Sequence, residues 1–484
     1  MINHSDTSNA VYDITEKQYW DNASFNQELD RVFDICIGCR LCFKLCPSFP
    51  TLFEAVDQIG DKKRVQAVAE GRVEEEDENR EYLDLAEGEH GVEASIEVEF
   101  RGEVTDLTHN QKWEVIDLCY QCKLCDPICP YTPDKEHEFQ LDFPKLMTRA
   151  QAIRSQDQHI KPSDRFLSNT DFSGKVGSMV APLTNFVNTN KFFRMLMHHV
   201  IGIHKDRILP KFHGETLEKW FKKKYNNPIK PEEVENEKVV IFGTCFVNNN
   251  DPEVGKAAVE ILKYNNVSVA YPKQQCCGAP FLSPGDFKGF KKQAEPNIRE
   301  LIKWVENGYK IVVTGPPTCS LTLKKEYPYI FGKDPQLASL VQKISENTYG
   351  ISEYLMYLHK KEQLRTDFKN EIGSVNYHVS CHLKAQSMGF KSRDLLRLIP
   401  NTQIRMVNRC SGMDGGWGMK KEFFQESLKV GEKCVKDLDK KDADITCSDC
   451  TLAALQIYQA SGERIQAEHP IETLHRAYGL AEKS

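Results

Sequence analysis

The 484-residue sequence lacks long apolar runs, an export signal and an excess of positive charge. No run approaches the ~18 apolar residues that a membrane-spanning helix needs. The first residues, MINHSDTSNA, have neither the basic nor the apolar region of a signal peptide. We therefore expect a cytoplasmic protein. The net charge of −7 provides no basic field, which excludes nucleic acid as an expected partner.

The sequence also lacks the motifs of the common redox nucleotides. No G-x-G-x-x-G follows a strand-like run, and no P-loop pattern is present. The glycines at 412–416 have the wrong spacing and are predicted to form a turn. We therefore expect no flavin or nicotinamide site. A chain without such a cofactor depends on a partner protein for two-electron chemistry.

Cysteine, by contrast, is abundant, with 17 residues in a chain without an export signal. Because a reducing cytosol keeps thiols unpaired, clustered intracellular cysteines indicate metal binding or catalysis. Cys434 fits no motif and is expected to take no part in such a site.

Two cysteine runs share the pattern C-x2-C-x2-C-x3-C-P, which is typical of bacterial ferredoxins with two [4Fe–4S] clusters. In this pattern the fourth cysteine of each run ligates the other cluster. Zinc is disfavoured because its sites use separated pairs and four ligands in total. We predict one cluster held by Cys36, Cys39, Cys42 and Cys129, and a second held by Cys119, Cys122, Cys125 and Cys46.

The chain is predicted to contain four parts. Residues 1–150 form a ferredoxin-like α+β module that is largely helical, and residues 151–235 form a helical connector. Two α/β repeats follow, at 236–360 and 361–484. An insert at 74–99 in the first module has twelve Asp or Glu residues and one basic residue, Arg80. It is either a solvated loop or a docking patch for a basic partner.

The two repeats are visible as matched cysteine landmarks. Cys245 and Cys381 each follow a strand-like run, Cys276 matches Cys410, and Cys319 matches Cys450, at offsets of 136, 134 and 131 residues. Three landmarks at a near-constant offset indicate an internal duplication. The alternation of strand-like and amphipathic stretches favours α/β units around a mainly parallel sheet.

Several segments of the sequence resemble those of the CCG-repeat iron–sulfur family. The matching segments are GTCFVNNNDPEVGK (243–256), QCCGAPF (275–281), SCHLKAQSMG (380–389) and GWGMKKEFF (416–424). The family includes subunits of anaerobic glycerol-3-phosphate dehydrogenase and of heterodisulfide reductase, and the iron–sulfur subunits of glycolate and lactate oxidation. The resemblance implies an electron-transfer subunit. In the family, a complete repeat carries five cysteines that hold a non-cubane iron–sulfur cluster.

Both repeats depart from that pattern. Pro316 replaces one cysteine in the first repeat, and Ser411 replaces one in the second. Four thiols remain in each repeat and suffice for a [4Fe–4S] cluster or a zinc ion. For both repeats, absence of metal stays an alternative. The candidate metal ligands are Cys245, Cys276, Cys277 and Cys319 in the first repeat, and Cys381, Cys410, Cys447 and Cys450 in the second.

We expect all four thiols of the second repeat to share one metal-sized pocket, with Cys434 outside it. A further iron–sulfur cluster is the favoured occupant. His378, His382 and His469 lie near the motif ends. A core or hydrogen-bonding role is expected for these histidines rather than metal ligation.

Residues 192–201 in the connector repeat apolar side chains at helical spacing, with Arg194, Lys205 and Arg207 nearby. This segment is either a helix packed against the protein or one that lies on a membrane surface. In the second case the protein would be peripheral on the inner face of the membrane.

The sequence as a whole favours an electron-transfer subunit of an oxidoreductase rather than an enzyme with its own substrate. A flavin dehydrogenase subunit or another redox protein would supply electrons, and a quinone or a soluble carrier would receive them. The alternative function is that of a thiol–disulfide reductase subunit similar to heterodisulfide reductase.

Overall fold

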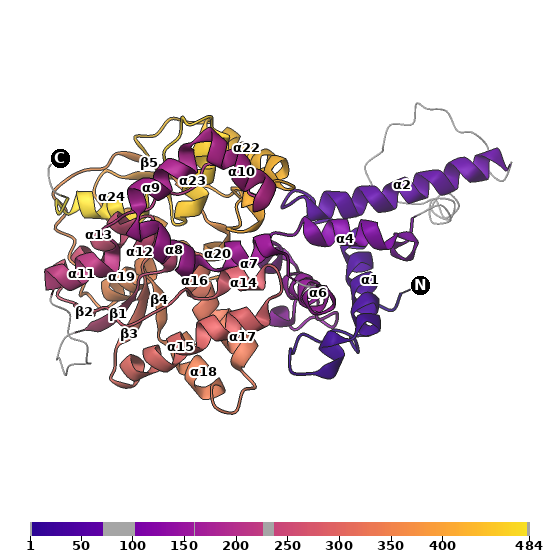
Figure 1. Cartoon of the computed structure of the whole chain (residues 1–484), viewed down its shortest axis with the longest axis horizontal. Helices are drawn as coiled ribbons and strands as arrows, with labels where there is room; N and C mark the ends of the chain where they lie inside the picture. Colours follow the sequence, from indigo (N-terminus) through magenta and orange to yellow (C-terminus); the bar gives the residue numbers. More distant parts are fainter. Residues whose placement is uncertain (1, 71–101, 159, 226–236, 482–484) are drawn as a thin grey trace.

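The computed structural model describes residues 2–70, 102–158, 160–225 and 237–481. The acidic insert predicted at 74–99 lies outside these residues. The N-terminal helices project to one side of a larger body that contains two small sheets (Figure 1). The connector helices α8, α9 and α10 run across the face of that body (Figure 1).

The described part of the N-terminal module consists of helices and contains no strand, so the expected ferredoxin-like α+β fold stays a prediction. Asp21 caps α1 by accepting a hydrogen bond from the Ser24 amide, and Thr108 caps α4 through the Gln111 amide. The elements are η1 (Lys17–Trp20), α1 (Asn22–Cys39), α2 (Ser48–Ala69), η2 (Val104–Asp106), α4 (His109–Asp117), α5 (Cys125–Ile128), η3 (Pro133–Lys135) and α6 (Phe143–Asp157).

The connector folds into five short helices, because caps and prolines start a new helix every ten residues or so. Asn169 accepts a hydrogen bond from the Phe172 amide, and Asn190 accepts one from the Phe192 amide. The helices are α7 (Pro162–Ser168), α8 (Thr170–Met179), α9 (Ala181–Thr189), α10 (Lys191–Val200) and α11 (Leu217–Tyr225).

The first repeat is built on a parallel four-stranded sheet in the order β2-β1-β3-β4. Its strands are β1 (Lys238–Phe242), β2 (Ser268–Ala270), β3 (Lys310–Val313) and β4 (Thr348–Gly350). Its helices are α12 (Cys245–Asn249), α13 (Pro252–Tyr264), α14 (Ala279–Leu282), α15 (Phe287–Glu306), α16 (Pro317–Leu321), η4 (Thr322–Glu326), α17 (Tyr327–Phe331), α18 (Ala338–Glu346) and α19 (Ile351–Lys360).

The second repeat has a parallel three-stranded sheet in the order β6-β5-β7, which is the same order as β2-β1-β3. The expected α/β duplication is therefore present in the topology. Its strands are β5 (Ser374–His378), β6 (Gln403–Val407) and β7 (Ile445–Ser448). Its helices are α20 (Cys381–Lys384), α21 (Lys391–Leu396), η5 (Trp417–Met419), α22 (Phe424–Leu438), α23 (Thr451–Ala460) and α24 (Pro470–Ala477).

One hydrophobic core joins the two repeats. Val239 and Ile241 of β1, Val375 and Tyr377 of β5, and Leu474 of α24 are fully or almost fully buried in a single cluster. This shared core fixes how the two sheets face each other. Among the described helices, none is both long enough and apolar enough to cross a membrane.

Candidate redox site

The first group of predicted ligands lies where α1 ends. Cys36 and Cys39 occupy the last turn of α1, three residues apart, so their side chains share one helix face. Arg40 ends the helix in the left-handed conformation, with φ of 49°, and turns the chain toward Cys42. Burial raises the pKa of Cys36 well above its usual range, and the thiols of Cys42, Cys129 and Cys39 raise it further. The structure thus brings this predicted group together.

The second group surrounds the loop between α4 and α5. Gln121 and Lys123 in this loop both have positive φ, 54° and 57°, and Lys123 is held by an ion pair to the first repeat. Cys119 precedes these residues, and Cys125 begins α5. Burial raises the pKa of Cys119 to about 12, with the thiol of Cys46 as the next cause. Cys46, Cys119 and Cys125 therefore lie within electrostatic reach of one another.

Cys122, the remaining member, faces the second repeat and donates a hydrogen bond to Cys410. Cys381 donates to the same sulfur at a Sγ–Sγ distance of 3.3 Å. The Tyr120 hydroxyl donates at 3.2 Å and the Gly412 amide at 3.3 Å. The thiol hydrogen bonds from Cys122 and Cys381 are the main reason why the pKa of Cys410 lies well below its usual range, although burial opposes this.

Two further contacts join the ferredoxin module to the repeats. The rings of Tyr120 and Trp417 pack at a centroid distance of 4.7 Å. The imidazole of His382 bonds to the Thr318 hydroxyl of the first repeat and to the Gln121 carbonyl of the ferredoxin module, both at 2.8 Å. One histidine thus ties together three parts of the chain.

The four predicted ligands of the second repeat do not all meet. Cys450 immediately precedes α23 and borders the same cavity as Cys381. Cys447 is still inside β7, where it is fully buried in the shared core and bonds to the Thr473 hydroxyl at 3.3 Å. The two thiols do not share one turn, because β7 continues to Ser448 and only Cys450 lies beyond the sheet. This position of Cys447 differs from the expectation of one four-thiol pocket.

Cys434 is fully buried on α22 in a separate apolar cluster with Val407, Leu438 and Ile457. It lies in a different apolar cluster from Cys381 and Cys410 and does not border the cavity, although its thiol is within electrostatic reach of both.

The four candidate ligands of the first repeat do meet. The Cys245 and Cys276 sulfurs are 3.8 Å apart, and those of Cys277 and Cys319 are 3.4 Å apart. All four residues follow the carboxyl ends of β1, β2 and β3, which lie at the same edge of the sheet. Gly278 follows the pair with φ of 96° and lets the chain turn sharply beside it.

The connector contributes two residues that sequence reasoning did not identify. Both carboxylate oxygens of Asp171 accept the Cys276 amide, at 3.0 and 2.9 Å. The Thr170 hydroxyl lies against the thiols of Cys245 and Cys276. In sequence these two residues have the pattern of an ordinary helix start, so only the tertiary contact reveals them.

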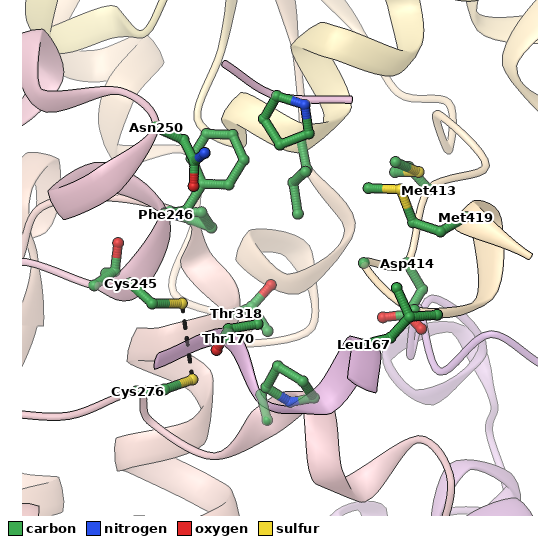
Figure 2. A pocket seen from close by; sticks show the side chains of 18 of the residues that line it. Leu167, Thr170, Cys245, Phe246, Asn250, Cys276, Thr318, Met413, Asp414 and Met419 are labelled. Carbon is green, nitrogen blue, oxygen red and sulfur yellow. Dashed lines mark hydrogen bonds between the residues drawn. The ribbon is translucent and has the colours of Figure 1, made fainter. Parts of the chain in front are cut away.

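A cavity of about 600 Å³ separates the thiols of the two repeats. Figure 2 shows Cys245 and Cys276 on one side of it, and Met413, Asp414 and Met419 on the other. The thiols that line it are Cys122, Cys245, Cys276, Cys277, Cys319, Cys381 and Cys450. The glycine-rich turn at 412–416 was predicted only as a turn, but it places a carboxyl group in this cavity.

The surroundings of the thiols suit iron–sulfur clusters. The hydroxyls of Ser380 and Thr451, which flank Cys381 and Cys450, are buried and have no hydrogen-bond partner among the described residues. Such donors can bond to the sulfurs of a cluster, an interaction that tunes cluster potentials. No three Cys, His, Asp or Glu side chains in the described part of the chain are placed to share a single metal ion.

The three histidines have the predicted hydrogen-bonding roles. His378 bonds to the Ser448 hydroxyl and the Arg409 carbonyl, both at 2.9 Å. His469 caps α24 by accepting the Ile471 amide at 3.2 Å. The contacts of His382 are those described above.

Comparison with known families matches both kinds of cysteine motif. Residues 35–134 match a 4Fe-4S dicluster domain. Residues 239–324 and 375–457 each match the cysteine-rich domain CCG. The chain is 27% identical over 332 residues to an Escherichia coli K12 protein named as a subunit of anaerobic glycerol-3-phosphate dehydrogenase, covering 68% of this chain and 80% of the relative.

The chain is an iron–sulfur protein that resembles this subunit of anaerobic glycerol-3-phosphate dehydrogenase. Lactate utilization protein A of Bacillus pumilus is 27% identical over 246 residues, covering 50% of this chain and 97% of the relative. The protein of that name from Geobacillus kaustophilus is 28% identical over 251 residues, with the same coverage. These relatives and domains identify an iron–sulfur electron-transfer protein in which a dicluster domain precedes two CCG repeats.

Proposed function

We propose that this protein is the electron-transfer subunit of an oxidoreductase complex. A flavin dehydrogenase, for which glycerol 3-phosphate is a candidate substrate, feeds electrons in, and a quinone or a soluble carrier receives them. The name of the E. coli relative supports a role beside a dehydrogenase. The absence of a dinucleotide or flavin motif from the sequence agrees with a division of labour between subunits.

The predicted ligand sets are part of this proposal. When bound, a [4Fe–4S] cluster takes up and releases single electrons. The protein supplies the thiols, their buried surroundings and the hydrogen bonds that set the potential. One cluster is assigned to Cys36, Cys39, Cys42 and Cys129, a second to Cys119, Cys122, Cys125 and Cys46, and a third iron–sulfur group to Cys381, Cys410 and Cys450. The first-repeat thiols Cys245, Cys276, Cys277 and Cys319 are a candidate fourth site.

The observation that carries the proposal is the contact between the ferredoxin module and the second repeat. Cys42 of the first group lies within electrostatic reach of Cys46 of the second. Cys122 of the second group donates a hydrogen bond to Cys410. The thiol groups therefore form a row that leads from the projecting module to the cavity between the repeats.

An apolar surface beside the cavity supports a membrane-bound acceptor. Helix α10 packs against the protein on the side of Arg194, which is 5% exposed, whereas Phe192, Leu196 and Val200 are 72%, 51% and 72% exposed. The neighbouring helices continue this surface, which we call the apolar face. Its residues are Phe166, Phe172, Val176, Met179, Val180, Leu183, Phe186, Phe192, Met195, Leu196 and Val200.

The charge around the apolar face suits an anionic lipid surface. In a chain with a net charge of −7, the connector at 160–214 exposes one acidic residue, Asp206. It exposes six basic residues, which are Lys161, Arg165, Lys175, Lys191, Lys205 and Lys211. We therefore propose that the protein lies peripherally on the inner face of the membrane through this surface.

Two of the basic residues expected to contact lipid have another role. Arg194 and Arg207 are buried, with 5% and 2% exposure. Arg194 donates to the carbonyls of Lys205, His204 and Arg207, whereas Arg207 bonds to the Gln456 and Ser427 side chains. Arg194 thus holds two segments of the connector together, and Arg207 holds the connector to the second repeat, because a buried guanidinium needs such acceptors.

Anaerobic purification of the full chain tests the proposed function. We expect at least about eight iron atoms and as many acid-labile sulfides per chain, with EPR signals of reduced [4Fe–4S] clusters. The reduced protein should be reoxidised by a quinone in liposomes and not by an organic disulfide. Zinc in place of iron would refute the proposal. Preferential oxidation by the disulfide would favour the thiol–disulfide reductase alternative.

A further inference from the structure

The cavity between the repeats opens onto the apolar face. Phe166, Phe172, Val176, Val180 and Leu183 line the cavity, yet each is at least 41% exposed at the surface. The same side chains therefore border both the interior space and the surface proposed to meet lipid. A lipid-soluble molecule can follow this path without crossing a charged surface.

The interior of the cavity has the properties of a site for an apolar ligand. Its volume of about 600 Å³ lies within the range of ligand pockets, roughly 300–1,000 Å³, although iron–sulfur groups on the lining thiols would fill part of this space. Among the side chains labelled in Figure 2, Thr170, Thr318, Asn250 and Asp414 carry polar groups, and Asp414 lies opposite Cys245 and Cys276. The apolar residues that line it away from the surface include Leu167, Phe246, Met413, Met419 and Leu452.

Asp414 is placed to bond to a ligand in this space. The Ser283 hydroxyl and the Trp417 amide both bond to its Oδ2, at 3.3 and 3.4 Å. Its Oδ1 accepts no hydrogen bond from the described residues, although the side chain borders the cavity. One oxygen is thus held by the protein, and the other is left for a polar atom of the ligand.

The surroundings of Asp414 shift its carboxyl toward the protonated form. Burial raises the pKa of this carboxyl, and His382 and Lys420 oppose the shift from the adjoining elements. The thiol of Cys119 also lies within electrostatic reach. A protonated carboxyl can donate a hydrogen bond to a carbonyl oxygen, which an ionised one cannot.

We propose that the cavity is a binding site for a lipid-soluble quinone, which enters through the apolar face and accepts a hydrogen bond from Asp414 at a ring oxygen. This inference rests on the proposed function and names the acceptor and its site. A bound quinone would lie between Cys381 and Cys450 of the second repeat and Cys245 and Cys319 of the first, since all four border the same space.

The test is equilibrium binding to the oxidised full-length protein, measured by titration calorimetry. The probe is a fully substituted benzoquinone with a ten-carbon tail, whose ring has no free position for thiol addition. We expect one site per chain. Leu183→Glu, which puts a charge in the opening, should weaken binding at least about tenfold. Asp414→Val, which removes the hydrogen bond, should weaken it about five- to tenfold.

Met179→Glu is the matched control. Met179 is 78% exposed on the apolar face and does not line the cavity. This variant should bind the quinone as the wild type does, while both glutamate variants lose binding to liposomes. No binding to the wild type, or equal loss in Leu183→Glu and Met179→Glu, would overturn the inference. Several equivalent sites in every variant, as expected of binding to the surface only, would also overturn it.

The outcome is separable from that of the proposed function. Absent quinone binding with intact EPR signals would remove this site and leave the electron-transfer role standing. Quinone binding to a protein that holds zinc rather than iron would support this site and refute the electron-transfer role. Because Leu183 lies on the surface, its variant keeps the test decisive even if Asp414→Val does not fold.

Discussion

The hydroxyl of Tyr120 donates a hydrogen bond to the sulfur of Cys410 at 3.2 Å. The two residues are 290 positions apart, one in the ferredoxin module and the other in the second CCG repeat. The contact is buried and lies beside the thiol of Cys122. It therefore sets the electrostatic environment of the sulfur at which the two parts of the protein meet.

Removing this hydrogen bond should lower the potential of the group in the second repeat. A hydrogen bond stabilises a negatively charged sulfur and thus the reduced state. In Tyr120→Phe we expect a downward shift of roughly 40 mV, which corresponds to about 1 kcal/mol for one electron. A redox titration followed by EPR measures it. Tyr329→Phe, which alters a partly buried tyrosine bonded to Tyr19, is the control and should leave the potential unchanged.

The positions of Cys447 and Cys450 predict opposite results for two similar substitutions. Cys450→Ala should alter or abolish the EPR signal of the second repeat, because this thiol borders the cavity beside Cys381. Cys447→Ala should keep the iron content and lower stability by about 1 kcal/mol, since it removes a buried sulfur and its bond to Thr473. Loss of the signal in Cys447→Ala would instead restore the expectation of four ligands.

Lipid binding should depend on the exposed basic residues of the connector. Reversing the charge of Lys175, Lys191 and Lys205 should weaken binding to anionic liposomes by about 1 kcal/mol for each residue. Co-sedimentation with vesicles of defined composition measures this. Arg194→Glu is a different experiment, because it should unfold the connector by leaving buried carbonyls unpaired. Equal binding of the wild type and the triple variant to anionic vesicles would argue against the membrane-facing assignment.

Electrons should enter through the exposed loop around the first thiol group. Leu41, Phe43 and Ile128 are 59%, 44% and 36% exposed beside Cys42 and Cys129. Leu41→Asp should slow reduction by a co-purified flavin dehydrogenase about tenfold while leaving reduction by dithionite unchanged.

Val65→Asp is the control for this experiment, since Val65 is 69% exposed on α2 of the same module. Stopped-flow absorbance measures both rates. Similar effects of the Leu41 and Val65 variants would place the contact with the dehydrogenase elsewhere.

The stability of the second repeat should depend on the ionisation of Glu472. Burial, helped by Asp251, raises the pKa of Glu472 from 4.5 to about 7. The folded state therefore binds more protons than the unfolded state between pH 4.5 and 7, so the free energy of unfolding falls as the pH rises through this window. The expected loss is roughly 2–3 kcal/mol.

Glu472→Gln removes this titration and keeps an oxygen that can accept the His469 amide. Its melting temperature should change less between about pH 5 and pH 8 than that of the wild type, as measured by calorimetry. An unchanged pH dependence in the variant would show that the carboxyl does not titrate in this range.

The sequence alone determined the local features of this protein. Cysteine spacing specified the two dicluster motifs, because ligands three residues apart fit one cluster loop whatever surrounds them. The offsets of Cys245, Cys276 and Cys319 from their counterparts revealed the duplication, and both repeats have the same strand order. Thiol groups that follow strand ends meet at one edge of a parallel sheet, so the first-repeat group was also within reach of sequence reasoning.

Tertiary structure decided the rest, because these features depend on contacts between segments far apart in the chain. Only the end of β7 separates Cys447, which faces the core, from Cys450, which faces the cavity. Only packing turns Arg194 inward and leaves Phe192 exposed on the same helix. Cys122 meets Cys410 because the ferredoxin module docks on the second repeat, and no spacing within either motif encodes that contact.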